Sequence, residues 1–70
     1  MNARLWELVR MEDETGVSGT GVVADGIEFP DGTAAMKWRG ELSSVAFYQG
    51  GIKDVLAIHG HGGKTRVRFF

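Results

Sequence analysis

The chain has 70 residues, of which 43% are hydrophobic, with a formal net charge of −1 and no cysteine. This length allows one domain, expected over residues 1–70, which buries only about 60% of the surface that the unfolded chain exposes. The absence of cysteine excludes disulfides, thiolate zinc sites, iron–sulfur clusters and thiol nucleophiles, and leaves hydrophobic packing or self-association to stabilise the domain.

The first segment, residues 3–11, alternates imperfectly between apolar and polar residues. Trp6 and Leu8 share one face. Leu5 and Val9 share the other, as in a strand that is partly covered on both sides. We interpret this segment as a strand, with a short amphipathic helix as the alternative.

An acidic loop is expected over residues 12–16, followed by a second strand over residues 18–29. The pair Asp25-Gly26 is compatible with either a hairpin turn or a β-bulge. Because residues 27–29 are too few for a useful strand of their own, we predict one long strand bent by a bulge at Gly26. Such a bend helps a small barrel to close.

A turn follows at Pro30-Asp31-Gly32, where proline presets φ and glycine takes the left-handed position. Two further strands are predicted over residues 33–39 and 42–48. Their side chains should alternate between the core and solvent. We expect inward positions at Ala34, Met36, Trp38, Val45 and Phe47, and outward positions at Thr33, Lys37, Arg39, Ala46 and Tyr48.

The apolar positions 52, 55 and 56 suit one or two helical turns, and residues 64–70 alternate as a last strand. Four strands, a short helix and a fifth strand is the element order of Src-homology-3-type domains. We therefore predict a mainly β fold, a small five-stranded Src-homology-3-type barrel with one short helix before the last strand. This analogy concerns the fold and carries no function.

His59 and His61 lie in a glycine-rich turn, two residues apart. On an extended backbone both rings would face one side, about 7 Å apart, and a metal site would need a carboxylate such as Asp54 or Glu41 as third ligand. The alternative, which we favour, is that both histidines cap the helix end and hydrogen-bond the turn. The following Gly62-Gly63-Lys64-Thr65 fails as a phosphate-binding loop in both spacing and context.

Catalytic residues are not evident in this sequence. A serine nucleophile needs a base and an orienting partner, and Ser18, Ser43 and Ser44 occupy ordinary turn or strand positions. We expect no enzyme activity and no cofactor.

Charge is distributed unevenly along the chain. Residues 1–35 hold two basic and seven acidic residues, whereas residues 36–70 hold six basic and two acidic ones. Opposite charges that pair across strands would explain this distribution. The alternative is a nucleic-acid interface, because cations beside an aromatic ring are typical of single-strand binders. Its residues would be Lys37, Arg39, Lys64, Arg66 and Arg68, with Tyr48 nearby.

Four short motifs are distinctive: Gly16-Val17-Ser18-Gly19-Thr20-Gly21, Phe29-Pro30-Asp31-Gly32-Thr33, Trp38-Arg39-Gly40-Glu41 and His59-Gly60-His61-Gly62-Gly63. With them, residues 5–69 resemble a group of small proteins from actinobacteria and their phages. No activity is established for that group. The resemblance implies a stand-alone cytoplasmic accessory protein, phage-encoded, and transfers no catalytic residue.

The leading functional hypothesis is a non-enzymatic binding protein that contacts another protein and can self-associate. We expect Tyr48, Phe70 and Arg68 at this interface, because outward aromatic side chains and an unpaired last strand favour association. No apolar stretch approaches the ~20 residues that span a bilayer. The apolar start of the chain, interrupted by Glu7, does not match a signal peptide. We therefore expect a cytoplasmic location and no membrane partner.

Overall fold

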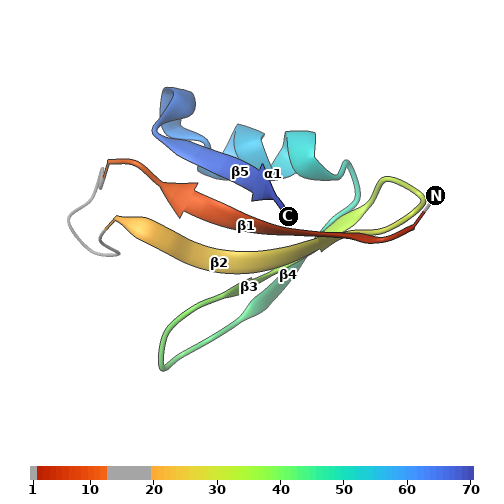
Figure 1. The fold of residues 1–70 in the computed structure, drawn as a ribbon, viewed down its shortest axis with the longest axis horizontal. Coiled ribbons are helices and arrows are strands. Elements are labelled where there is room, and N and C mark those ends of the chain that lie inside the picture. The colour runs from red at the N-terminus through yellow and green to blue at the C-terminus, as the bar shows by residue number, and fades with distance from the viewer. Residues whose placement is uncertain (1, 13–19) are drawn as a thin grey trace.

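The computed structural model describes residues 2–12 and 20–70, which form one antiparallel five-stranded sheet and one short α-helix (Figure 1). Most of the predicted acidic loop, from residue 13 on, lies outside the described residues. The strand order across the sheet is β4-β3-β2-β1-β5. The elements in chain order are β1 (Arg4–Arg10), β2 (Gly21–Glu28), β3 (Ala34–Trp38), β4 (Val45–Tyr48), α1 (Ile52–His59), the single 3₁₀ turn η1 (His61–Gly63) and β5 (Thr65–Phe69).

The mainly β fold and the helix before the last strand are confirmed, but the predicted closure into a barrel is wrong. A barrel would require β4 and β5 to pair, and among the described residues each of them pairs with one neighbour only, β3 and β1 respectively. The helix α1 packs against both edge strands. It therefore covers the core where a strand ladder would otherwise close the sheet.

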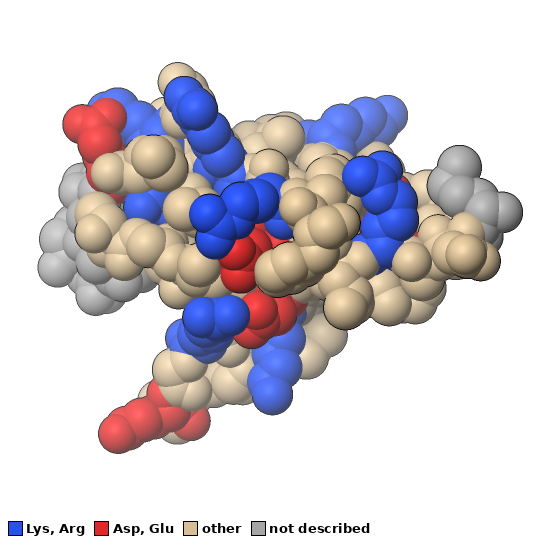
Figure 2. Space-filling model, viewed as in Figure 1, with Lys and Arg blue, Asp and Glu red and all other residues tan. Residues whose placement is uncertain are grey.

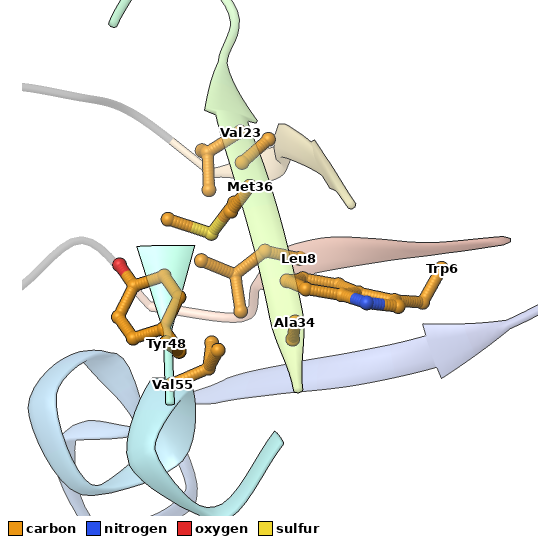
Figure 3. Packing of buried hydrophobic residues seen from close by; sticks show 8 residues of the cluster. Trp6, Leu8, Val23, Ala34, Met36, Tyr48 and Val55 are labelled. Carbon is orange, nitrogen blue, oxygen red and sulfur yellow. The ribbon is translucent and has the colours of Figure 1, made fainter. Parts of the chain in front are cut away.

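One face of the sheet, which we call the inner face, carries the hydrophobic core. The predicted inward positions on β3 are confirmed, since Ala34 and Met36 are buried and Trp38 packs against the cluster. Figure 3 shows side chains from β1, β3, β4 and α1 meeting between the sheet and the helix. The buried core consists of Trp6, Leu8, Val23, Ala24, Ala34, Met36, Tyr48 and Val55.

Gly26 has a different role from the predicted bulge. The irregularity in the β1–β2 ladder lies between Leu8 and Val9 and leaves Val23 as the additional residue on β2. Gly26 instead pairs regularly with Trp6, and a Cβ built on it would lie 2.2 Å from the Trp6 indole. The glycine is required because the indole lies directly against its backbone.

The predicted faces of β4 are also wrong. Tyr48 points into the core and is only 7% exposed, whereas Val45 and Phe47 point outward. In the ladder, Lys37 lies opposite Val45, and Ala35 opposite Phe47, so these side chains share a face. A shift of one residue in register exchanges the two faces of a strand.

The turn between β2 and β3 forms as predicted. Gly32 has φ 88°, and its N–H donates to the Phe29 carbonyl at 2.9 Å. The Asp31 carboxylate accepts hydrogen bonds from both the backbone N–H and the hydroxyl of Thr33, which lower the pKa of Asp31 below its ordinary value. These contacts set the register in which β2 and β3 pair.

Candidate functional site

The face of the sheet turned away from the core and α1, here the outer face, carries two rows of side chains that cross the strands. The first is a row of charged residues. Ladder pairing places Arg68 beside Glu7, Glu7 beside Asp25, and Asp25 beside Lys37. We call Arg68, Glu7, Asp25 and Lys37 the charged row. Arg39, at the end of β3, reaches the same carboxylates.

Glu7 is the centre of this row and is only 6% exposed. Nε of Arg68 donates to Glu7 Oε1 at 2.8 Å, and Nη2 donates to the same oxygen. On the other side, Nη2 of Arg39 lies 3.9 Å from Glu7 Oε2. The two guanidinium groups compensate the buried carboxylate, since an unpaired charge at this position would be costly.

Asp25 and Arg39 form a bidentate ion pair, with Nε to Oδ2 at 2.9 Å and Nη2 to Oδ1 at 2.8 Å. The hydrogen bonds from Arg39 lower the pKa of Asp25, and the same contact raises the pKa of Arg39. Figure 2 shows acidic side chains near the middle of this face with Lys and Arg side chains around them. The predicted cross-strand pairing of opposite charges is therefore confirmed for Arg39 and Arg68.

The basic residues of the nucleic-acid hypothesis are only partly brought together. Lys37, Arg39, Arg66 and Arg68 lie on the outer face, while Lys64 lies at the end of η1. Nε of Arg66 donates to the Gly63 carbonyl at 3.4 Å. The stacking ring expected beside them is absent from this surface, because Tyr48 faces the core.

The second row on the outer face is apolar along its entire length. Leu5 lies opposite Ile27, Ile27 opposite Ala35, and Ala35 opposite Phe47. Phe70 extends this row beyond Leu5, because its N–H donates to the Leu5 carbonyl at 3.2 Å. We call Phe70, Leu5, Ile27, Ala35 and Phe47 the apolar row; its three largest exposures are 81% for Phe70, 61% for Leu5 and 60% for Phe47.

A hollow of about 300 Å³ lies between the two rows, lined by Asp25, Ile27, Ala35, Lys37 and Val45 with the backbone of Gly26 and Met36. Its walls are mainly apolar, and charged side chains stand on one rim. A larger hollow of about 510 Å³ lies between α1, η1 and β5. Its apolar lining comes from Ile52, Leu56, Val67 and Phe69.

The predicted interface residues fall in two places. Phe70 and Arg68 are exposed on the outer face, one in each row. Tyr48 is buried in the core, and its hydroxyl lies 2.9 Å from Nε2 of His59, at hydrogen-bond distance. Burial raises the pKa of Tyr48, which keeps the phenol protonated. Tyr48 thus belongs to the core rather than to an interaction surface.

The two histidines do not converge on a common ligand position. His59 ends α1 with its ring 5.0 Å from Trp38 in an edge arrangement, and burial, followed by the charges of His61 and Arg10, lowers its pKa. His61 is exposed, with φ 48°. Asp54, proposed as a third ligand, accepts the Gly50 N–H at 2.9 Å instead. Within residues 2–12 and 20–70, no three His, Cys, Asp or Glu side chains gather in a group that could hold a metal ion.

Two buried polar groups on the inner face were missed in the sequence. Arg10 and Thr65 are cross-strand neighbours, and both are buried. Nε of Arg10 and Oγ1 of Thr65 have no hydrogen-bond partner among the described residues. Strand alternation places Arg10 on the face of Leu8 and Thr65 on the face of Val67, which is a signal for burial although polar residues are mostly exposed.

The fold and the outer face define a small protein built on one open antiparallel sheet, with a candidate interaction surface made of a charged row and an apolar row. The model of the Acb5 phage protein family matches residues 3–70. The chain therefore belongs to the Acb5 phage protein family, which confirms the phage part of the sequence resemblance. No curated protein and no solved structure matches the chain. None of the described helices is long and apolar enough to cross a membrane.

Proposed function

We propose that this phage protein is a non-enzymatic accessory protein that binds another protein through the outer face of its sheet, in the cytoplasm. One observation carries the proposal: the apolar row crosses β1 to β4, continues to Phe70 just beyond the end of β5, and exposes three large side chains to solvent. Contiguous exposed apolar surface with a polar rim is typical of protein interfaces.

The arrangement of the two rows supports a specific contact. Two phenylalanines, Phe47 and Phe70, lie at opposite ends of the apolar row and supply large rigid surfaces. The charged row beside it supplies Arg68, Asp25 and Lys37 as a polar border. In such an interface, apolar anchors contribute most of the affinity and the charges select the partner and its orientation.

The absence of enzyme activity remains part of the proposal. His59 is the described group whose lowered pKa would most suit acid–base chemistry, and it contacts Tyr48 and Trp38 rather than a nucleophile. The element order also supports a Src-homology-3-type topology in an open form, and the four sequence motifs support an origin in phages of actinobacteria.

The test is cross-linked capture of partners from phage-infected host cells, followed by reconstitution of each candidate complex from purified proteins. Leu5→Ser with Phe70→Ser removes two exposed anchors, and we expect the affinity of a true partner to fall at least about tenfold, the effect of losing one or two interface anchors. Lys53→Ser, on an exposed position of α1, is the matched control. A reconstituted partner that binds the double variant as tightly as the wild type contradicts the proposal.

A second candidate is nucleic-acid binding by the outer face, which groups four basic side chains, Lys37, Arg39, Arg66 and Arg68, around the two carboxylates of Glu7 and Asp25. Binding of this kind weakens steeply as salt rises. An amide NMR titration with single- and double-stranded oligonucleotides at low and then higher salt tests it. Salt-sensitive shifts at Lys37 and Arg66 support this candidate, and their absence removes it.

A further inference from the structure

Within the part of the chain that the structure describes, the open sheet has two unpaired edges, and the ladder geometry identifies the backbone groups exposed along each. On β4, the N–H of Trp38 donates to the carbonyl of Ser44 at 3.0 Å. Antiparallel ladders alternate between hydrogen-bonded and non-hydrogen-bonded pairs. The backbone N–H and carbonyl groups of Ala46 and Tyr48 therefore also point toward β3. The N–H and carbonyl groups of Val45 and Phe47 therefore point away from the sheet along the free edge.

The β4 edge carries no charged side chain, proline or bulge, three of the features that usually prevent strands from pairing with other molecules. Natural edge strands are protected by charged side chains, prolines, bulges or a covering element. The four residues of β4, VAFY, include no charge and no proline, and the β3–β4 register is regular. Val45 and Phe47 are 70% and 60% exposed. The hairpin that carries them projects from the sheet, at the end opposite β5 (Figure 1).

The β5 edge is less available for pairing than the β4 edge. By the same alternation, the backbone N–H and carbonyl groups of Thr65, Val67 and Phe69 point toward the free edge. The N–H of Thr65, however, already donates to the Gly60 carbonyl at 3.0 Å. The hollow along this edge is lined by α1 and η1. Pairing of β5 with a second copy about a twofold axis at Val67 would also place Arg66 of each copy directly opposite Arg68 of the other, which is unfavourable.

We propose that two copies of this chain pair antiparallel through their β4 strands, about a twofold axis at Ala46, to form a continuous ten-stranded sheet. This register places Val45 opposite Phe47 of the second copy, and each of these residues has the N–H and carbonyl groups that a bonded pair exchanges. Four hydrogen bonds then join the copies. On the outer face, two aromatic and two β-branched side chains meet at the axis, a favourable cross-strand combination.

Charge does not oppose this arrangement. Lys37 is the nearest cation in the sheet, since it lies beside Val45 on β3. The two copies of Lys37 would lie three strand spacings apart, about 14 Å, which is beyond the screening length at physiological salt. The β4 edge therefore accepts a second copy without the like-charge contact that opposes self-pairing at the β5 edge.

This inference goes beyond the proposed function, because it names the backbone edge of β4 and a specific partner. Phe47 belongs to both surfaces, but the outer-face interface is tested with Leu5 and Phe70, which lie on β1 and beyond β5, away from the β4 edge. The two can therefore fail independently. Edges of four residues give a small interface, so we expect a weak dimer with a dissociation constant of about 100 µM.

The test is sedimentation analysis of the full chain from about 10 µM to about 1 mM, a range that brackets the expected constant. In Val45→Glu/Phe47→Glu, the introduced carboxylates of the two copies face each other. We expect the dimer dissociation constant of this variant to be at least about tenfold higher than that of the wild type. In Val45→Glu/Phe47→Lys, opposite charges face each other in the proposed register only, and dimerisation should return. Leu5→Glu/Phe70→Glu adds the same charge away from the edge and should dimerise like the wild type.

Several outcomes overturn the inference. These are a wild-type chain that stays monomeric throughout the concentration range, a Val45→Glu/Phe47→Glu variant that dimerises normally, or a charge-swapped variant that does not recover. Loss of dimerisation in Leu5→Glu/Phe70→Glu alone would place the contact on the outer face instead. If the variants unfold, amide hydrogen exchange of the wild type decides: protection of Val45 and Phe47, but not Val67, should rise with protein concentration.

Discussion

Leu5 and Leu8 lie three residues apart on β1, yet one is 61% exposed and the other completely buried. They illustrate the contrast between the two faces of the sheet. The inner face packs apolar side chains against α1, and its buried polar groups are few. The outer face combines ion pairs with exposed apolar side chains. The inner face therefore holds the packed core, whereas the outer face is the surface through which we propose that the protein binds its partner.

The largest expected effect tests the contrast between the inner and outer faces directly. Leu8→Ala should lower the free energy of unfolding by about 3 kcal/mol, because it leaves a cavity in a fully packed core. Leu5→Ala, the same change on the outer face, should cost less than about 0.5 kcal/mol. Chemical denaturation of both variants measures the difference. Equal losses would contradict the assignment of the faces.

The next prediction concerns the contact between Gly26 and Trp6. Gly26→Ala should cost about 1 to 3 kcal/mol, because its Cβ would overlap the indole ring of Trp6. Trp6→Leu shortens that side chain, so the double variant should lose less than the sum of the two single losses. A double-mutant cycle by thermal or chemical unfolding tests this coupling, and additive losses would show that the two residues act separately.

On the outer face, two glutamates allow a matched comparison. Glu7→Gln should cost about 1 to 2 kcal/mol, since it removes the charge-assisted bonds from Arg68 to a buried carboxylate. Glu28→Gln should cost less than about 0.5 kcal/mol, because Glu28 pairs at 3.7 Å with an exposed Arg4. High salt should reduce the second loss more than the first. The reverse order in urea denaturation would show that the Glu7 contacts do not stabilise the fold.

The smallest effect is a difference in pH dependence between the faces. Burial lowers the pKa of His59 below its ordinary 6.5, so the unfolded chain binds more protons there and stability falls as pH drops below 6.5. Asp25 has a lowered pKa as well, but its contribution is lost only as pH falls below its ordinary 3.8. Of these two groups, only His59 therefore contributes to the change in stability between pH 7 and pH 5, which unfolding curves measure.

The control for this pH dependence is a pair of variants. His59→Gln keeps a polar group beside Tyr48 and should remove most of the slope between pH 5 and pH 7. His61→Gln changes an exposed side chain and should leave the slope from His59 largely in place. If the slope survives in His59→Gln, the protonation of another group must account for it.

Several features of this fold could be predicted because they depend on local sequence. The turn at residues 30–32 follows from the conformational preferences of proline, aspartate and glycine. The faces of β3 follow from the alternation of Ala34 and Met36 with Lys37 and Arg39. The helix after Gly51 follows from its apolar spacing. The patterns of β3 and of the helix contain both polar and apolar residues, so only one arrangement of each buries the apolar ones.

The faces of β4 could not be predicted in the same way. All four of its residues, VAFY, are hydrophobic, so hydrophobicity alone does not distinguish the two faces. The register is decided by the bond between Trp38 and Ser44 and by the pairing of Ala34 with Tyr48. This error moved Tyr48 to the predicted interface and left Phe47 out of it. The apolar row could therefore be recognised only from the structure.

The sequence by itself determined the strands, the turn, the helix and the inward positions Ala34, Met36 and Trp38 of β3, because alternation and turn chemistry act over a few residues. Only the tertiary structure decided that the sheet stays open, that Glu7 is buried beneath Arg68, and that five apolar side chains align across the outer face. Arg68 lies 61 residues from Glu7 in the chain. Contacts of this kind depend on strand order and register, which arise when distant segments pack together.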